Sequence, residues 1–160
     1  MFWPFKRYDV EMSPRVAGRV MDGDKPVVGI EVFRVLVYQG YKKGKELRAS
    51  TVTDSKGRFE FSELMVRSRY PGDIFGQNFG VYQGVYLDDG PEVTYLWSTN
   101  KPPHHIATLA KLISNLDCEI KAKEKDYEID VLAEGGRREQ PITSICVWNN
   151  TYLKNISKHL

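Results

Sequence analysis

Residues 30–38, IEVFRVLVY, are almost continuously apolar and β-branched. Such a run is typical of an interior strand that is covered on both faces of a sheet. Apolar residues change from one face to the other where Val32 meets Phe33, and this change predicts a bulge near those two residues. The face that follows the change carries Phe33, Val35 and Val37. The run therefore requires a packed β-sheet.

Turn-forming residues separate this run from other short segments with strand patterns. The expected strands are Arg15 to Val20, Ile30 to Tyr38, Ala49 to Asp54, Arg58 to Phe61, Val81 to Leu87, Glu92 to Ser98, Cys118 to Ala122, Tyr127 to Leu132 and Thr143 to Trp148. Asp54 can accept turn hydrogen bonds and Gly57 can take the left-handed conformation, which predicts a hairpin at 55–57. About seven to nine short strands with turn chemistry between them predict an all-β sandwich.

One segment has helical rather than strand periodicity. Apolar residues recur in it at the spacing of one helical face, and Pro103 suits a first helical turn. These apolar residues are Ile106, Leu109, Leu112 and Ile113. They predict one short helix over 103–114, followed by C-terminal strands over 115–150. The glycine- and proline-containing segment 67–78 predicts a long loop.

The length and charge of the chain limit the class of protein to which it can belong. At 160 residues, positions 1–160 are expected to form a single domain. The 23 Lys and Arg residues nearly balance 21 Asp and Glu residues and are scattered, which argues against nucleic-acid binding. No segment is apolar enough to span a membrane, and the N-terminus lacks the apolar core of a secretory signal. We therefore expect a soluble, cytoplasmic protein.

Cys118 and Cys146 both fall in expected strands. Free cysteine is among the most buried residue types, and a reducing cytosol keeps thiols unpaired. We therefore expect two small core residues. A disulfide between them is the alternative, and it would fit an oxidising compartment.

The segment from Gly18 to Phe61 has a recognisable order. It reads G-R-V, then D-K-P-V-V-G-I-E-V, and after a variable hairpin T-V-T-D-S-K-G-R-F-E-F. This order resembles the carboxypeptidase-regulatory-like, or transthyretin-like (prealbumin-like), β-sandwich, with the core motif over 14–65. The resemblance implies a Greek-key sandwich that serves mostly as a non-catalytic accessory or binding module.

One catalytic branch of that fold, the hydroxyisourate hydrolases, does not match this chain. Those enzymes carry histidine-containing strand motifs and a C-terminal Tyr-Arg-Gly-Ser, whereas this chain ends in TYLKNISKHL and has no histidine before His104. An L-x-C after the helix and an S-I-C-x-W near the end resemble small standalone bacterial proteins of unknown function. Proteins of this size and type often accompany secreted toxins as immunity or accessory partners, and the resemblance brings no known active site.

No set of residues forms a catalytic or metal-binding motif in the sequence. His104 and His105 are adjacent, so their side chains point in different directions and favour a polar helix entry over a metal pair. Cys118 and Cys146 lack a closely spaced partner that could nucleate a zinc site. Serines such as Ser144 lie within strand patterns and not on a glycine-flanked elbow. The sequence therefore predicts no cofactor, no metal and no enzymatic activity.

Candidate contact residues lie in the second expected hairpin and in the loop before it. They are Tyr82, Tyr86, Asp88, Asp89, Glu92, Arg69 and Tyr70. Outward-facing tyrosines would supply binding energy, whereas inward-facing ones would belong to the core. The acidic hairpin tip could meet a basic partner, although Asp-Asp-Gly-Pro is also ordinary turn chemistry. Trp97 is expected to be a core residue.

Two functional hypotheses follow. The first is a non-enzymatic protein-binding domain, a bacterial immunity protein that neutralises a cognate secreted toxin by occlusion. The alternative is a carbohydrate- or surface-binding accessory module of an exported system. The alternative predicts a disulfide between Cys118 and Cys146 together with an aromatic groove, so the state of the two cysteines discriminates between the hypotheses.

Overall fold

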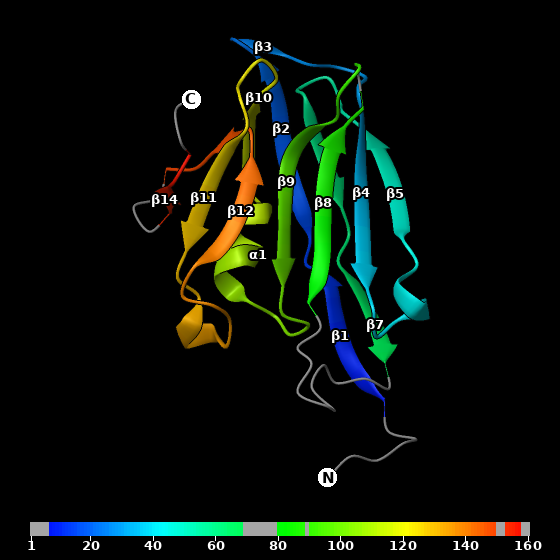
Figure 1. Cartoon of the computed structure of the whole chain (residues 1–160). Coiled ribbons are helices and arrows are strands. Elements are labelled where there is room, and N and C mark those ends of the chain that lie inside the picture. Colours follow the sequence, from blue (N-terminus) through cyan, green and yellow to red (C-terminus); the bar gives the residue numbers. More distant parts are fainter. Residues whose placement is uncertain (1–6, 69–79, 89, 150–152, 158–160) are drawn as a thin grey trace.

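A computed structural model describes residues 7–68, 80–88, 90–149 and 153–157, and most of these residues lie in strands (Figure 1). The strands are β1 (Tyr8–Ser13), β2 (Val16–Asp22), β3 (Lys25–Pro26), β4 (Glu31–Tyr38), β5 (Leu47–Val52), β6 (Arg58–Phe61), β7 (Leu64–Ser68), β8 (Val81–Leu87), β9 (Thr94–Lys101), β10 (Leu116–Glu119), β11 (Lys125–Ile129), β12 (Gln140–Ser144), β13 (Cys146–Val147) and β14 (Lys154–Asn155). The helical elements are α1 (Ala107–Ile113) and two short 3-10 turns, η1 (Lys42–Gly44) and η2 (Leu132–Glu134). The expected all-β sandwich with one short α-helix is confirmed.

The larger layer is a seven-stranded sheet in the order β14-β11-β12-β9-β8-β4-β5. The apolar run forms β4, which pairs with β8 on one side and β5 on the other and is therefore an interior strand, but the expectation that both of its faces are covered is wrong, because Phe33 and Val37 are partly exposed. Both pairings are continuous, so the predicted bulge near Val32 and Phe33 is wrong. The side chains of β4 simply alternate, with Val32 buried and Phe33 partly exposed. The irregularity lies instead between Val85 and Tyr86, where β8 meets β9.

The second layer is a five-stranded sheet in which β2 lies between β10 and β6. The two-stranded sheet β1-β7 continues it in the same register, because Ser13 pairs with Leu64 and Val16 pairs with Phe61. The two sheets thus share a ribbon that bends at Pro14, a residue that cannot donate a ladder hydrogen bond. The bend divides two long strands into four, which helps to explain why the described strands outnumber the seven to nine expected.

The turn at 55–57 connects the two layers. β5 pairs with β4 and β6 pairs with β2, so the predicted pairing of these two segments as a hairpin is wrong. The turn chemistry is as predicted: the Asp54 carboxylate accepts hydrogen bonds from the backbone N–H groups of Lys56 and Arg58, and Gly57 has a φ of 73°. These two hydrogen bonds lower the pKa of Asp54. The chain therefore crosses between layers where sequence alone suggested a return within one sheet.

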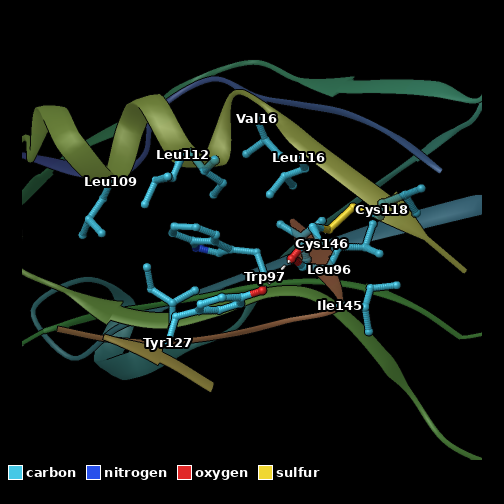
Figure 2. Packing of buried hydrophobic residues seen from close by; sticks show 14 of the residues in the cluster. Val16, Leu96, Trp97, Leu109, Leu112, Leu116, Cys118, Tyr127, Ile145 and Cys146 are labelled. Carbon is cyan, nitrogen blue, oxygen red and sulfur yellow. Dashed lines mark hydrogen bonds between the residues drawn. A yellow bond between two sulfur atoms is a disulfide. The ribbon is translucent and has the colours of Figure 1, made fainter. Parts of the chain in front are cut away.

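The main hydrophobic core fills the space between the layers (Figure 2). Trp97 lies at its centre with no exposed surface, which confirms its assignment to the core. Its ring meets the ring of Trp148 edge-on, with the ring centroids 6.0 Å apart. Leu109 and Leu112 of α1 pack above the Trp97 ring (Figure 2). The short helix thus covers the core beside the five-stranded sheet.

The helix begins at Ala107, later than the predicted start at 103. Ile106 is extended. The Lys101 ammonium donates hydrogen bonds to the carbonyl oxygens of Pro102 and His104, and these bonds hold the segment before the helix in an irregular turn. In the part of the chain that the structure describes, no helix has both the length and the apolar character needed to cross a membrane.

A row of polar side chains joins the seven-stranded sheet to the bent ribbon. The hydrogen bonds run from Arg34 Nη1 to the Ser62 carbonyl oxygen (2.7 Å), from Gln83 Nε2 to the Met12 carbonyl oxygen (3.2 Å) and from Lys101 Nζ to the Glu11 carbonyl oxygen (2.9 Å). Buried carbonyl groups need such partners wherever a ladder is interrupted. We call Arg34, Gln83 and Lys101 the polar seam. Its N–H groups donate hydrogen bonds to backbone carbonyl oxygens of the ribbon near the bend.

Cys118 and Cys146 form a disulfide. The two residues occupy directly opposed positions of β10 and β13, and their Cα atoms lie 4.1 Å apart. Opposed positions on neighbouring antiparallel strands bring side chains close enough to bond. The expectation of two free thiols is therefore wrong, although both residues are buried as predicted. The bridge ties the start of the C-terminal strands to their end.

Candidate functional site

Three aromatic side chains form a row on the outer face of the seven-stranded sheet. Phe33 on β4 lies opposite Tyr86 on β8, and Tyr86 lies opposite Tyr95 on β9. All three side chains are partly exposed. The strands that carry them lie side by side in Figure 1. The bulge between Val85 and Tyr86 sets the register that brings Tyr95 across from Tyr86.

The rings of this row contact one another. Phe33 and Tyr86 are stacked with their centroids 5.3 Å apart and their planes at 20°. Tyr86 and Tyr95 are tilted at 59° with centroids 6.0 Å apart. Stacked and tilted pairs of this kind stabilise one another beyond the area they bury.

Tyr82 adds a fourth ring beside the row. It lies on the same face of β8 as Tyr86, and its ring leans over Gly84, where an added Cβ would lie 2.9 Å from the Tyr82 hydroxyl oxygen. The glycine thus makes room for the ring. The Tyr82 hydroxyl group lies 3.3 Å from the Ser98 hydroxyl oxygen, within hydrogen-bond distance. Burial first, and then the neighbouring Tyr82 phenol, raise the pKa of Tyr95, so this phenol stays a protonated donor at neutral pH.

Arg48 on β5 forms the other end of this surface. Its guanidinium carbon lies 5.0 Å from the ring centroid of Phe33 and 5.7 Å from that of Tyr86. The side chain is exposed, and within the described residues it makes no ion pair or hydrogen bond. We call this surface the aromatic face; it consists of Arg48, Phe33, Tyr82, Tyr86, Tyr95 and Ser98.

The sequence-based candidates divide into three groups. Tyr82 and Tyr86 lie on the aromatic face and are neither fully buried nor fully exposed. Asp88 and Glu92 are exposed in the turn that follows β8, beyond Tyr86. Arg69, Tyr70 and Asp89 lie outside the described residues. In the predicted loop 67–78, Arg67 and Ser68 belong to β7 instead, because they pair with β1.

Four residues of the aromatic face were not among those candidates, namely Phe33, Arg48, Tyr95 and Ser98. The alternation along β4 indicated that Phe33 shares one face with Val35 and Val37. Arg48 was missed because β5 begins at Leu47, two residues before the expected start of this strand at Ala49. Tyr95 was missed because its position depends on the bulge in the pairing of β8 with β9, which no local pattern signals.

The two histidines among the described residues, His104 and His105, have structural partners. The His104 ring nitrogen Nε2 lies 2.9 Å from the Glu134 carbonyl oxygen, and His105 Nδ1 lies 2.6 Å from Glu11 Oε2. The second Glu11 oxygen lies 3.4 Å from the Lys101 ammonium. The pKa of Lys101 is lowered, because the effect of burial exceeds the opposite effect of the Glu11 charge. In the described segments no three His, Cys, Asp or Glu side chains are grouped so as to hold a metal ion.

A hollow lies on the opposite side of the molecule. It has a volume of about 900 Å³ and follows the outer face of β2, β6 and β10. Four of its charged groups are already paired, with Arg15 Nε 2.7 Å from Glu60 Oε1 and Arg19 Nε 2.8 Å from Asp117 Oδ1, whereas Arg58 makes no ion pair within the described residues. These pairs raise the pKa of both arginines and lower that of Glu60. The hollow therefore offers a ligand few unpaired charges.

A protein-family model, described as a domain of unknown function (DUF6795), matches residues 16–123. The chain belongs to the DUF6795 family. The matched segment of this DUF6795 protein contains every residue of the aromatic face, together with α1 and Cys118. Cys146 lies beyond it. A search of the curated proteins finds no match, and a search of the solved structures finds none either. The resemblance to the transthyretin-like sandwich therefore stays a prediction.

Proposed function

We propose that this DUF6795 protein is a non-enzymatic binding domain that holds a protein partner on its aromatic face. The observation that carries the proposal is the row of Phe33, Tyr86 and Tyr95, which is partly exposed and ends at the unpaired cation of Arg48. Tyrosine and arginine side chains contribute much of the energy of protein interfaces. Their rigid placement on neighbouring strands lowers the entropy lost on binding.

The geometry of the rings favours a protein partner over a glycan. A sugar ring stacks on an open aromatic face, but Phe33 and Tyr86 are turned toward each other and Arg48 lies over both. Partly exposed rings, phenol hydroxyl groups and a guanidinium instead suit the mixed apolar and polar contacts of a protein surface. As the partner we propose a secreted toxin domain, neutralised by occlusion, following the sequence resemblance to small standalone bacterial proteins.

The disulfide supports a second candidate, an accessory module of an exported system that binds carbohydrate or another surface. Disulfides persist in oxidising compartments and are rare in the cytosol. This bridge bears on where the protein works, because a cytoplasmic location would leave Cys118 and Cys146 reduced. Counting thiols in native protein, unfolded without reductant, decides the point: no reactive thiol favours export, and two favour the cytoplasm.

The binding proposal is tested by co-expression with the product of the neighbouring gene. The expected result is a stable one-to-one complex in which the Phe33→Ala, Tyr86→Ala double variant binds at least tenfold more weakly than the wild type. Arg19→Ala, Asp117→Ala is the matched control, since it removes two exposed side chains from the opposite face. Loss of affinity in the control alone would contradict the proposal, as would the lack of any complex.

A further inference from the structure

We propose that Arg48 is the point at which the aromatic face binds a carboxylate side chain of its partner protein. This inference rests on the proposed function and adds the chemistry of the contact. The guanidinium of Arg48 lies over Phe33 and Tyr86 and points its charge at solvent, without a carboxylate within ion-pair distance in the described part of the chain.

Other arginines of the protein show what Arg48 lacks. Arg15 and Arg19 on the opposite face each contact a carboxylate of a neighbouring strand. Arg34 lies over an aromatic ring like Arg48, but it is buried and donates to the Ser62 carbonyl oxygen. Of these four arginines, Arg48 alone both stacks on aromatic rings and has N–H donors without an acceptor in the described part of the chain.

Support by two rings makes the cation a prepared binding point. Stacking limits the rotamers of the long side chain, so less entropy is lost when the guanidinium meets its partner. The planar fork of N–H donors matches the two oxygens of a carboxylate. Beside it, the partly exposed rings of Phe33 and Tyr86 can take the apolar stem of a glutamate side chain.

The partner chemistry is therefore an acidic segment flanked by apolar or aromatic groups. Among the described residues no acidic side chain lies within ion-pair distance of Arg48, and Glu31 of β4 pairs with Val52, at the far end of β5 from Arg48. Arg48 instead lies across from Val35. The cation thus belongs to the surface that the partner covers.

The test uses two acetylated, amidated tripeptides, Tyr-Glu-Tyr and Tyr-Gln-Tyr, titrated into the full chain and followed by NMR. We expect the glutamate peptide to bind wild-type protein about fivefold more tightly than the glutamine peptide. Arg48→Gln should remove this preference. Arg48→Lys, which keeps the charge but not the planar fork, should reduce it to about twofold.

Arg138→Gln is the matched control, because it removes an exposed cation from the loop before β12 and should keep the fivefold preference. Thermal unfolding of each variant verifies that it folds. An equal affinity of both peptides for wild-type protein would overturn the inference, and so would a preference that survives in Arg48→Gln. Either result leaves the complex with the neighbouring gene product to be judged separately, since that test does not depend on the charge of Arg48.

Discussion

Arg34 and Arg48 lie on opposite faces of the same sheet and are placed almost alike. Each guanidinium lies 5.0 Å from an aromatic centroid, Phe61 for Arg34 and Phe33 for Arg48. Arg34 is 7% exposed and donates to a carbonyl oxygen of the bent ribbon. Arg48 is exposed and has no acceptor within the described residues.

This difference in hydrogen bonding distinguishes the structural role of Arg34 from the proposed binding role of Arg48. Inside the sandwich, the donors of the polar seam are matched to carbonyl groups that the bend of the ribbon leaves unpaired. On the outer face, the donors of Arg48 have no acceptor among the described residues, and this is the basis of its proposed binding role. Loss of a seam residue should therefore change stability, and loss of an aromatic-face residue should change binding.

The largest effect is expected at Lys101. Lys101→Met removes the cation that contacts the Glu11 carboxylate and three carbonyl oxygens, and it leaves the buried Glu11 carboxylate with His105 as its remaining side-chain partner among the described residues. The free energy of unfolding should fall by about 3–5 kcal/mol. Urea denaturation measures the change. A loss below about 1 kcal/mol would mean that the seam does not hold the ribbon.

Replacing each arginine by leucine compares the two faces directly. Arg34→Leu should lower the free energy of unfolding by about 2 kcal/mol, because the Ser62 carbonyl oxygen loses a charged donor. Arg48→Leu should leave the unfolding midpoint unchanged and weaken the complex with the partner. Paired urea denaturation and binding measurements verify this division. An equal fall in the free energy of unfolding for Arg34→Leu and Arg48→Leu would contradict the distinction between a structural and a binding arginine.

The smallest effect concerns pH and the opposite face. Arg15 lowers the pKa of Glu60 from its usual value of 4.5, so the pair stabilises the fold above that value and loses its effect as the pH falls below it. Denaturation midpoints of wild-type protein should therefore decline somewhat more steeply below about pH 4.5 than those of Glu60→Gln. Arg48→Gln should reproduce the wild-type profile. A flattened profile in Arg48→Gln would show that Arg48 has a carboxylate partner of its own.

The sequence predicts much of the fold because local patterns encode it. The run in β4, the alternation of Phe59 and Phe61 and the turn chemistry of Asp54 with Gly57 all appear in the structure. The errors concern pairing partners. Whether β6 joins β5 or β2, and whether Cys146 meets Cys118, depends on contacts between distant segments that local periodicity does not contain.

The candidate site shows the same limit. Tyr82 and Tyr86 could be proposed because they alternate along a single strand. Arg48 and Tyr95 join them only through the pairing of four strands and through the register shift between Val85 and Tyr86. A surface assembled across strands becomes visible once the strand order is known.

The most direct test of the binding surface is NMR of ring-labelled phenylalanine and tyrosine in the free protein and in its complex. The account predicts that the largest changes occur at Phe33, Tyr82, Tyr86 and Tyr95 of the aromatic face. The buried rings of Phe61 and Tyr127 should stay nearly unchanged. Unchanged resonances of the aromatic face in a complex that forms would contradict the assignment of this face as the partner-binding surface.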